Sequence, residues 1–296
     1  MCREKYLAID VGGTTIKYTL TDKNAKTIKI NEIKTIRKPE KLFESLDEII
    51  HPHLNQIAGI ALSFPGKINA EHGIVHKVAT FDWICDMPLK SILEEKYKKP
   101  VWIENDGKCA VLAELWMGNL TDVNGMVIGL GTEIAGGIII NGALYPRSNE
   151  TAGEFSSILT DFKNPNNKKR FGKIEGHKNL TDEYNDKKYA IDSHELFEKY
   201  NEDDETAKEV VRDYAETIAA GIVTIQSVLD AEKFCIGGGI STQDILIAEI
   251  KDRVHDFYSV KFHEAVSEPA IEKSHFGNAS GCVGALYNFM IRQNVI

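Results

Sequence analysis

A glycine turn near the N-terminus brings together residue types that suit an oxyanion and a metal ion. In Tyr6–Asp22, apolar residues lead up to Asp10, a Gly-Gly turn follows, and alternation of apolar and polar residues resumes, which predicts a β-hairpin. Glycine has no Cβ, so backbone N–H groups in such a turn can approach a ligand closely. A nucleoside triphosphate with Mg²⁺ fits this set, and the alternative is a hairpin whose glycines serve only the turn. The candidate ligand groups are Asp10 (for Mg²⁺, through water), Gly12, Gly13, Thr14, Thr15 and Lys17.

A second polar segment, Glu104-Asn105-Asp106-Gly107, lies between a short apolar strand at 101–103 and a predicted helix that runs to Trp116. Asn105 is a good N-cap residue, which places Asp106 in the first helical turn. Asp106 could serve there only as an acid placed favourably against the helix dipole. However, α/β sheets also place their chemistry in loops that follow buried strands, so both interpretations stay open.

The opening pattern then recurs. Val127–Leu130 predicts a strand, residues 131–137 a glycine-rich turn, and 138–140 a second strand, followed by an Asn141-Gly142 hairpin signal. This repetition predicts an internal duplication, with two phosphate-binding hairpins facing each other across a cleft. A third glycine turn, Gly237-Gly238-Gly239, follows a strand at 233–236 and could border a base or ribose, or could be a plain turn.

The other elements alternate between strands and helices, which is typical of an α/β fold. We expect part of the polar segment 161–205 to be an exposed loop excursion, with a short helix near 193–200. The expected strands are 27–36 and 57–62, and the expected helices are 42–50, 89–97, 193–200, a long one through 211–229, and 281–291.

Composition limits the functional classes. The chain has 296 residues and a net charge of −9, which argues against general affinity for nucleic acid or anionic membranes. No apolar run reaches the length of a membrane span, and no signal peptide is predicted. The five cysteines form no CxxC pair, which indicates reduced thiols in a cytoplasmic protein.

Taken together, the motifs resemble those of the ROK family of sugar kinases and related repressors, within the actin-like ATPase superfamily. The resemblance covers nearly the whole chain and implies a two-lobed actin-like ATPase (ribonuclease H-like) α/β fold with duplicated domains. The expected domains are 1–117, completed by 281–296, and 118–280. The motifs are Asp10-x-Gly12-Gly13-Thr14, Ser63-x-Pro65-Gly66, Glu104-Asn105-Asp106, Gly131-Thr132 through Gly136-Gly137, Ala152-Gly153-Glu154 and Gly237-Gly238-Gly239.

The resemblance implies an ATP- and Mg²⁺-dependent kinase in which Asp106 takes a proton from a sugar hydroxyl, usually the one on C6. It further implies that Asn105 and Glu154 bind the sugar ring and that the loop of Ser63, Pro65 and Gly66 frames it. The two Gly-Thr turns, the second comprising Gly131, Thr132, Gly136 and Gly137, would hold the β- and γ-phosphates, and Gly238 and Gly239 would border the adenosine.

Three departures from the family pattern matter, one of which is Asn69, a neutral residue where relatives often place an acid after the Pro-Gly loop. Ser157 stands where many members have a zinc-binding histidine, and the chain has no cysteine cluster, so we expect no structural zinc, and His177 is expected to be a surface residue. Glu133 stands where relatives usually have glycine. A carboxylate about 4 Å from a phosphate would repel it by about 4 kcal/mol at an effective dielectric constant near 20, so we expect Glu133 to turn away or to pair with a cation.

Three functional classes follow from the resemblance. An ATP-dependent sugar kinase is favoured because the base and both turns are present. A repressor would carry a helix-turn-helix domain ahead of the first motif, where only nine residues precede Asp10. A non-catalytic sugar-binding protein with a phosphate loop impaired by Glu133 remains the alternative. The sugar stays open among β-glucosides, N-acetylmannosamine and simple hexoses, and the family suggests a homodimer.

Overall fold

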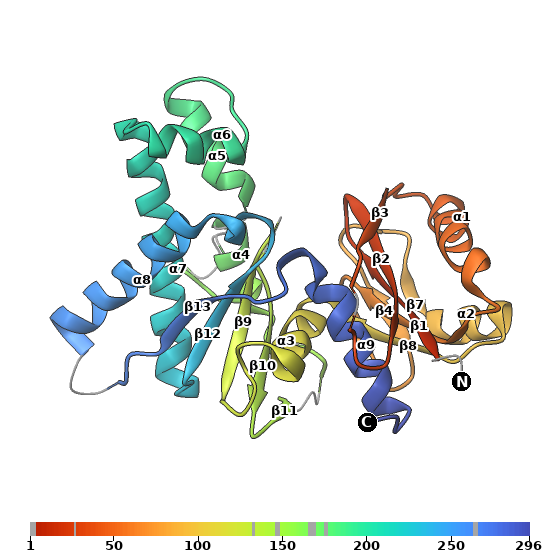
Figure 1. Ribbon diagram of the computed structural model, residues 1–296. Coiled ribbons are helices and arrows are strands. Elements are labelled where there is room, and N and C mark those ends of the chain that lie inside the picture. Colours follow the sequence, from red (N-terminus) through yellow and green to blue (C-terminus); the bar gives the residue numbers. More distant parts are fainter. Residues whose placement is uncertain are drawn as a thin grey trace. The chain divides into compact units, whose positions relative to one another are not determined.

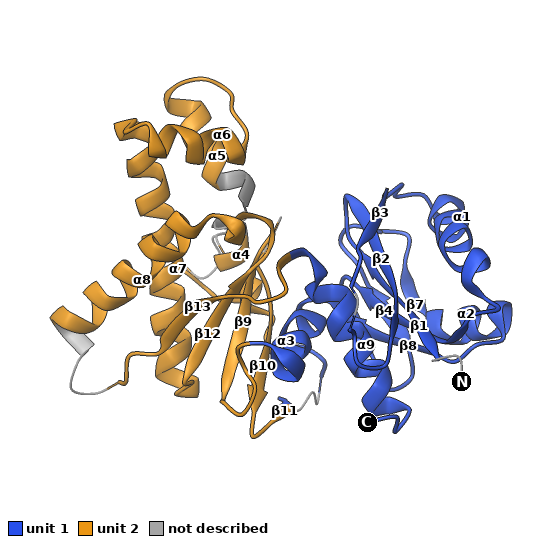
Figure 2. Ribbon diagram, viewed as in Figure 1, with its two compact units in different colours: residues 1–118, 144–152, 278–296 blue, residues 119–143, 153–277 orange. Residues whose placement is uncertain are grey.

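The chain forms two compact α/β units (Figures 1 and 2). The computed structural model describes residues 4–26, 28–131, 134–145, 149–164, 170–174, 177–262 and 266–296. Unit 1 comprises Met1–Gly118, Leu144–Ala152 and Asn278–Ile296, and unit 2 comprises Asn119–Ala143 and Gly153–Gly277. This division differs from the expected second domain at 118–280, because Leu144–Ala152 belongs to unit 1.

Unit 1 is built on a five-stranded sheet with the order β3-β2-β1-β4-β8. β1 and β2 form the predicted antiparallel hairpin, and β1, β4 and β8 run parallel. Successive side chains of a strand point to opposite faces, so β1 contributes to two cores. The strands are β1 (Lys5–Val11), β2 (Thr15–Asp22), β3 (Asn31–Lys34), β4 (Ile57–Phe64) and β8 (Val101–Asn105).

Helices cover both faces of this sheet. On one face Leu7 and Ile9 pack with helices α1 (Pro39–Ile50) and α2 (Leu89–Tyr97). On the other face Tyr6 and Ala8 pack with residues of α3 (Asp106–Met117) and α9 (Ser280–Arg292). The last long helix of the chain therefore completes the core that the first strand begins.

A small three-stranded sheet, which the sequence did not predict, follows β4. It consists of β5 (Lys67–Asn69), β6 (Ile74–Lys77) and β7 (Cys85–Met87). These strands are short and interrupted by turns, so no run of alternating residues is long enough to be recognised. The 3₁₀ turns of unit 1 are η1 (His51–His53) and η5 (Gly277–Ala279), the latter beginning at the unit boundary.

Unit 2 repeats the order of the first sheet, as β11-β10-β9-β12-β13. β9 and β10 pair antiparallel, whereas β12 is parallel to both β9 and β13. This agreement in strand order supports the predicted repetition. The strands are β9 (Gly125–Leu130), β10 (Ile134–Ile140), β11 (Ala143–Leu144), β12 (Lys233–Gly237) and β13 (Ala270–Lys273).

The segment 161–205 contains the predicted short helix near 193–200, and it also contains helices that were not predicted. Most of its described residues are helical, because a few apolar residues suffice to anchor helices against the core: Leu180 and Tyr184, at i, i+4 spacing in α5, and the adjacent Leu196 and Phe197 in α6 are buried. The remaining elements of unit 2 are η2 (Phe155–Ser157), α4 (Phe171–Ile174), α5 (His177–Lys187), α6 (Ser193–Asn201), α7 (Glu205–Leu229), η3 (Gly239–Thr242), α8 (Asp244–Phe257) and the π-helix η4 (Tyr258–Phe262).

Other predicted elements have different bounds in the structure. The second glycine-rich turn is shorter than predicted, because β10 already begins at Ile134. The strand expected at 27–36 is limited to β3, and α8 and β13 were not predicted. Within the described ranges, no helix is long and apolar enough to cross a lipid bilayer.

Candidate functional site

Polar residues of three parallel strands meet at one edge of the unit 1 sheet. Asp10 of β1 lies beside Ser63 of β4, and Phe64 lies beside Asn105 at the end of β8. Because β1, β4 and β8 are parallel, their carboxyl ends share this edge, which is where α/β sheets place their ligands. The Ser63 hydroxyl donates a 2.6 Å hydrogen bond to Asp10 Oδ1.

Asp10 sits in an environment that penalises its charge. Burial raises the pKa of this carboxyl above its ordinary value, while the Ser63 hydrogen bond and the charge of Lys17 oppose the rise. Lys17 lies opposite Asp10 in the β1–β2 hairpin, and its ammonium donates to Asn278 Oδ1 at 3.3 Å. A cation bound near Asp10 would favour the ionised form, so this carboxylate fits the expected hydrated Mg²⁺.

The turn between β1 and β2 is held by the segment that follows β3. The N–H of Gly12 donates to the carbonyl of Thr15 at 2.9 Å. The Thr35 hydroxyl donates to the Gly12 carbonyl at 2.7 Å, and Arg37 Nε donates to the Gly13 carbonyl at 3.0 Å. A Cβ on Gly12 would come within 2.8 Å of the Thr15 carbonyl oxygen, so this tight turn requires glycine.

Asp106 begins α3, and Asn105 caps that helix as predicted. The Asn105 carbonyl oxygen Oδ1 accepts from the N–H of Lys108 at 3.1 Å. Asp106 Oδ1 accepts from the N–H of Gly107 at 2.8 Å and from Asn105 Nδ2 at 3.0 Å. Two donors thus fix the orientation of the half-buried Asp106 carboxylate, and the positive end of the helix dipole stabilises its charge.

The Ser63–Gly66 loop is tied to the same group of residues. Asn105 Nδ2 also donates to the Gly66 carbonyl at 2.9 Å. Gly66 has φ +92°, and a Cβ there would lie 2.3 Å from the Lys77 carbonyl oxygen, so only glycine fits. Pro65 and Gly66 are half-buried, whereas Ser63 is fully buried and holds Asp10. We therefore assign Ser63 a role in positioning Asp10 in place of the expected sugar contact.

In unit 2, two glycine turns meet at the carboxyl edge of the sheet. Gly131 follows β9, Gly238 follows β12, and a Cβ on Gly238 (φ +90°) would lie 2.2 Å from the Leu130 carbonyl oxygen. Gly238 and Gly239 are exposed, and a Cβ on Gly239 would meet open space. Such a bare surface suits close approach by a flat ligand. Thr132 and Glu133 lie outside the described residues, so the prediction for the Glu133 side chain stays a prediction.

Gly136 and Gly137 lie inside strand β10 and not in the turn where the sequence had placed them. They pair with Ile128 and Val127 of β9. A Cβ on Gly136 would lie 2.4 Å from the ring of Phe155. Both glycines are buried, so we assign them to packing and withdraw them from the proposed phosphate contacts.

Glu154 is exposed and immediately precedes the 3₁₀ turn η2. The preceding Gly153 has φ +82°, and a Cβ there would lie 3.0 Å from Gly137 Cα. The Ala152-Gly153-Glu154 motif therefore crosses closely over β10. Gly153 is required for that approach, and it fixes where Glu154 emerges.

Sequence reasoning did not predict that two charged residues beside Asp106 are buried, Glu104 of the quoted motif and Lys108. Glu104 is completely buried and Lys108 is 2% exposed. Glu104 Oε1 accepts from the Asn105 N–H at 2.8 Å, and Lys108 Nζ lies 3.5 Å from Asn105 Oδ1. Glu104 belongs to β8 and Lys108 to the first turn of α3, so no periodicity of a single element links them, and their burial follows from the packing of this strand–helix junction.

Among the described residues no group of three or more His, Cys, Asp or Glu side chains could hold a metal ion. The side chain of His177 lies outside the described set. Cys85 is exposed, while Cys109, Cys235 and Cys282 are buried. A single carboxylate such as Asp10 suits Mg²⁺, which keeps most of its waters, better than a closed zinc site.

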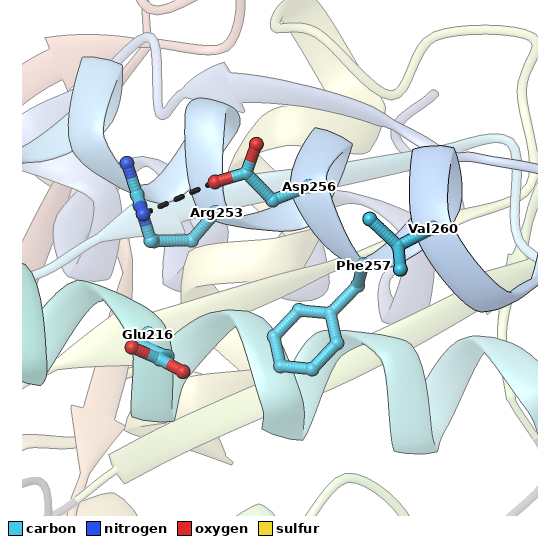
Figure 3. Close-up of a pocket in the computed structure, with 5 residues that line it drawn as sticks. All are labelled: Glu216, Arg253, Asp256, Phe257 and Val260. Atoms are coloured by element: carbon cyan, nitrogen blue, oxygen red, sulfur yellow. Dashed lines mark ion pairs between the residues drawn. The ribbon is translucent and has the colours of Figure 1, made fainter.

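A separate surface hollow lies in unit 2 between α7 and the end of α8 (Figure 3). It has a volume of about 180 Å³ and contains an Arg253–Asp256 ion pair of 3.1 Å. The ring of Phe257 points toward α7, where Glu216 lies. Its lining includes none of the predicted site residues, so we do not regard this hollow as the candidate functional site. The lining residues are Glu216, Arg253, Asp256, Phe257 and Val260.

Comparison with known proteins gives the class of this chain. The ROK family profile matches residues 6–291, so the protein belongs to the ROK family. A β-glucoside kinase of Listeria monocytogenes is 29% identical over 98% of this chain and 99% of its own length. An N-acetylmannosamine kinase of Haemophilus influenzae is 28% identical over 95% of this chain and 94% of its own length.

Solved structures confirm the predicted actin-like α/β fold class. A ROK family protein of Streptococcus pneumoniae in complex with sucrose superposes with a TM-score of 0.87 at 25% identity, covering 99% of this chain and 100% of that one. A ROK glucokinase of Streptomyces griseus in complex with glucose and AMPPNP has a TM-score of 0.84 at 20% identity, covering 95% and 98%.

Proposed function

We propose that the protein is an ATP-dependent sugar kinase that transfers the γ-phosphoryl group to a sugar hydroxyl, with Asp106 as general base. The observation that carries the proposal is the fixed Asp106 carboxylate at the start of α3, on the same sheet edge as Asp10. Membership of the ROK family and the sugar kinases among its relatives support it.

In the proposed mechanism, Asp106 accepts the proton of the attacking hydroxyl while that oxygen bonds to the γ-phosphorus and ADP leaves. Phosphoryl transfer depends mainly on positioning and on neutralising charge, so a base with a fixed orientation is well suited to it. Mg²⁺ would neutralise charge on the triphosphate. Asp10, oriented by Ser63, would hold its water ligands.

The other site residues have separate proposed roles. In unit 1, the 12–14 turn with Thr15 and Lys17 would bind phosphate oxygens. In unit 2, Gly131 and Thr132 would bind phosphates, Gly238 and Gly239 would border the adenosine, and Glu154 would bind a sugar hydroxyl. Asn105 would add a sugar contact beside Asp106, and Pro65 and Gly66 would frame the sugar.

The proposed substrate is a hexose derivative phosphorylated at its 6-hydroxyl, either a β-glucoside or an N-acylhexosamine. The names of two relatives, a β-glucoside kinase and an N-acetylmannosamine kinase, support these two classes. The proposed cytoplasmic homodimer rests on the family resemblance, and sedimentation analysis of the purified protein tests the dimer.

A coupled ADP-release assay tests the proposed function with cellobiose, other β-glucosides, N-acetylmannosamine and glucose as acceptors. At least one sugar should stimulate ADP release and yield a phosphorylated product of matching mass. If no sugar stimulates release although ATP binds, the non-catalytic alternative with a phosphate loop impaired by Glu133 is favoured.

A further inference from the structure

Arg37 contacts the first glycine turn and is not among the expected site residues. It follows β3, whose Lys34 pairs with Thr15 of β2, so the chain leaving β3 runs along the turn. The Thr35 N–H donates to the Thr14 carbonyl at 2.9 Å, and Thr35 Oγ1 donates to the Gly12 carbonyl. These bonds fix the segment that carries Arg37 against the turn.

The guanidinium of Arg37 uses one of its donors on the turn itself. Nε donates to the Gly13 carbonyl at 3.0 Å, which orients the planar group. Nη2 lies 3.5 Å from the place where a Cβ of Gly13 would stand. Guanidinium carries five N–H donors, so the bond to Gly13 leaves four N–H groups to serve other acceptors.

Thr80 borders the same bare side of Gly13. Its Oγ1 lies 3.7 Å, and its methyl carbon 3.1 Å, from the ideal Cβ position of Gly13. A guanidinium and a hydroxyl therefore flank a glycine whose missing side chain leaves the backbone open. The Arg37 side chain is exposed and forms no ion pair with any residue that the structure describes. In a chain of net charge −9, an exposed arginine beside a glycine turn is suited to an external anion.

We propose that Arg37, assisted by the Thr80 hydroxyl, binds the terminal phosphate of the nucleoside triphosphate at the 12–14 turn. The inference rests on the proposed function for the identity of the anion. Planar guanidinium groups match phosphate oxygens in a two-point geometry, which an ammonium group does not reproduce. Arg37 is then a phosphate-binding residue in addition to holding the Gly13 carbonyl.

Equilibrium binding tests the proposal with three ligands, namely AMPPNP with Mg²⁺, adenosine, and inorganic tripolyphosphate. Hydrogen bonds to charged groups are strong enough that Arg37→Ala should weaken AMPPNP binding about 10- to 100-fold. Adenosine affinity should change less than about twofold, and the rise in melting temperature caused by tripolyphosphate should be lost. Arg37→Lys should restore only part of the AMPPNP affinity, because the two-point geometry is missing.

Two further variants separate binding from support of the turn. Thr80→Val keeps the shape and methyl group, so it should weaken AMPPNP binding several-fold, by about the value of one hydrogen bond, without lowering the melting temperature. Lys38→Ala removes the same charge from the next residue, an exposed one whose side chain does not cap α1, and should leave AMPPNP affinity within about twofold.

Each outcome decides a separate question. Equal losses of adenosine and AMPPNP affinity in Arg37→Ala, or no loss of either, overturn the inference and leave Arg37 a support of the turn. If the wild type transfers phosphate to a sugar and Arg37→Ala binds AMPPNP normally, the inference fails and the kinase assignment stands. If AMPPNP binding depends on Arg37 but no sugar is phosphorylated, the inference stands and the proposed function fails.

Discussion

Gly281, in the first turn of α9, lies directly against the carboxylate of Asp10. A Cβ on Gly281 would come within 2.3 Å of Asp10 Cγ and 2.5 Å of Oδ1. The C-terminal helix therefore forms one wall of the site in which Asp10 is held by Ser63. Since backbone on one side and a hydroxyl on the other confine this carboxylate, its orientation depends on a residue more than two hundred positions away.

Gly281→Ala should impair Mg²⁺-dependent ATP binding. Alanine favours the helix by about 1 kcal/mol over glycine, but the added methyl group must displace Asp10. We expect ATP affinity in the presence of Mg²⁺ to fall by more than about tenfold, measured by calorimetry. Ser280→Ala, in the same turn, is the control and should retain normal affinity. Normal Mg·ATP binding by Gly281→Ala would contradict a role for Asp10 in holding the metal.

Asp106→Asn should nearly abolish turnover and leave binding intact. An asparagine Oδ1 can still accept from the Gly107 N–H, so α3 should keep its start. Loss of the base should reduce kcat by about 10²- to 10⁴-fold, while melting temperature and ATP affinity stay near those of the wild type. Steady-state kinetics and ligand titration measure this, and a variant with near-normal kcat would remove Asp106 from the mechanism.

Asp10→Asn should change stability in a pH-dependent way. Burial raises the pKa of Asp10 in the folded state, so between the unfolded and folded pKa values the folded protein binds more protons than the unfolded one. Stability from this residue is therefore greatest below the unfolded pKa and falls as pH rises through the folded pKa. Without Mg²⁺, the variant should gain stability relative to the wild type as pH rises from about 4 to 8.

Melting curves of both proteins across that pH range measure the difference. Added Mg²⁺ and ATP should stabilise the wild type and reverse the order, because the metal favours ionised Asp10. A stability difference that does not vary with pH would show that burial of Asp10 carries no charge penalty.

Gly66→Ala should destabilise unit 1 far more than Gly142→Ala destabilises unit 2. Both glycines have positive φ, +92° and +70°, so both variants incur the backbone cost of about 1 kcal/mol. At Gly142 no atom lies within 4 Å of the added Cβ, whereas at Gly66 the Lys77 carbonyl oxygen lies at 2.3 Å. The difference between the two variants in the loss of unfolding free energy, measured by denaturant unfolding, isolates the steric cost of adding a Cβ in the Gly66 loop. Equal losses would show that the loop can relax.

Sequence patterns correctly predicted the elements that position Asp106 and Asp10. The strand at 101–103 and the N-cap of α3 are local signals, and the structure agrees with them: Asn105 caps the helix, and Asp106 lies in its first turn. The β1–β2 hairpin was similarly evident because apolar alternation and a Gly-Gly turn lie within one short segment. In both cases the residues of one short segment were sufficient to predict the element.

Other features depend on contacts between distant segments and could not be predicted from local patterns. Ser63 looked like a loop residue, but parallel pairing of β1 with β4 buries it against Asp10. Arg37 carries no motif, and its place beside Gly13 follows from the pairing of β3 with β2. Gly136 resembled part of a phosphate-binding turn. In the structure the ring of Phe155 occupies the space that a side chain at position 136 would need, so the position requires glycine.

The packing of α9 on the first strand also constrains how the molecule is made. Tyr6 and Ala8 share a core with Cys282, Leu286 and Phe289, and the whole of unit 2 is encoded between those two groups. During synthesis, N-terminal segments emerge from the ribosome first, yet this core lacks its last helix until residue 292 has been added. Unit 2 can therefore acquire its structure first, and the surroundings of Asp10 are completed only after α9 has been synthesised.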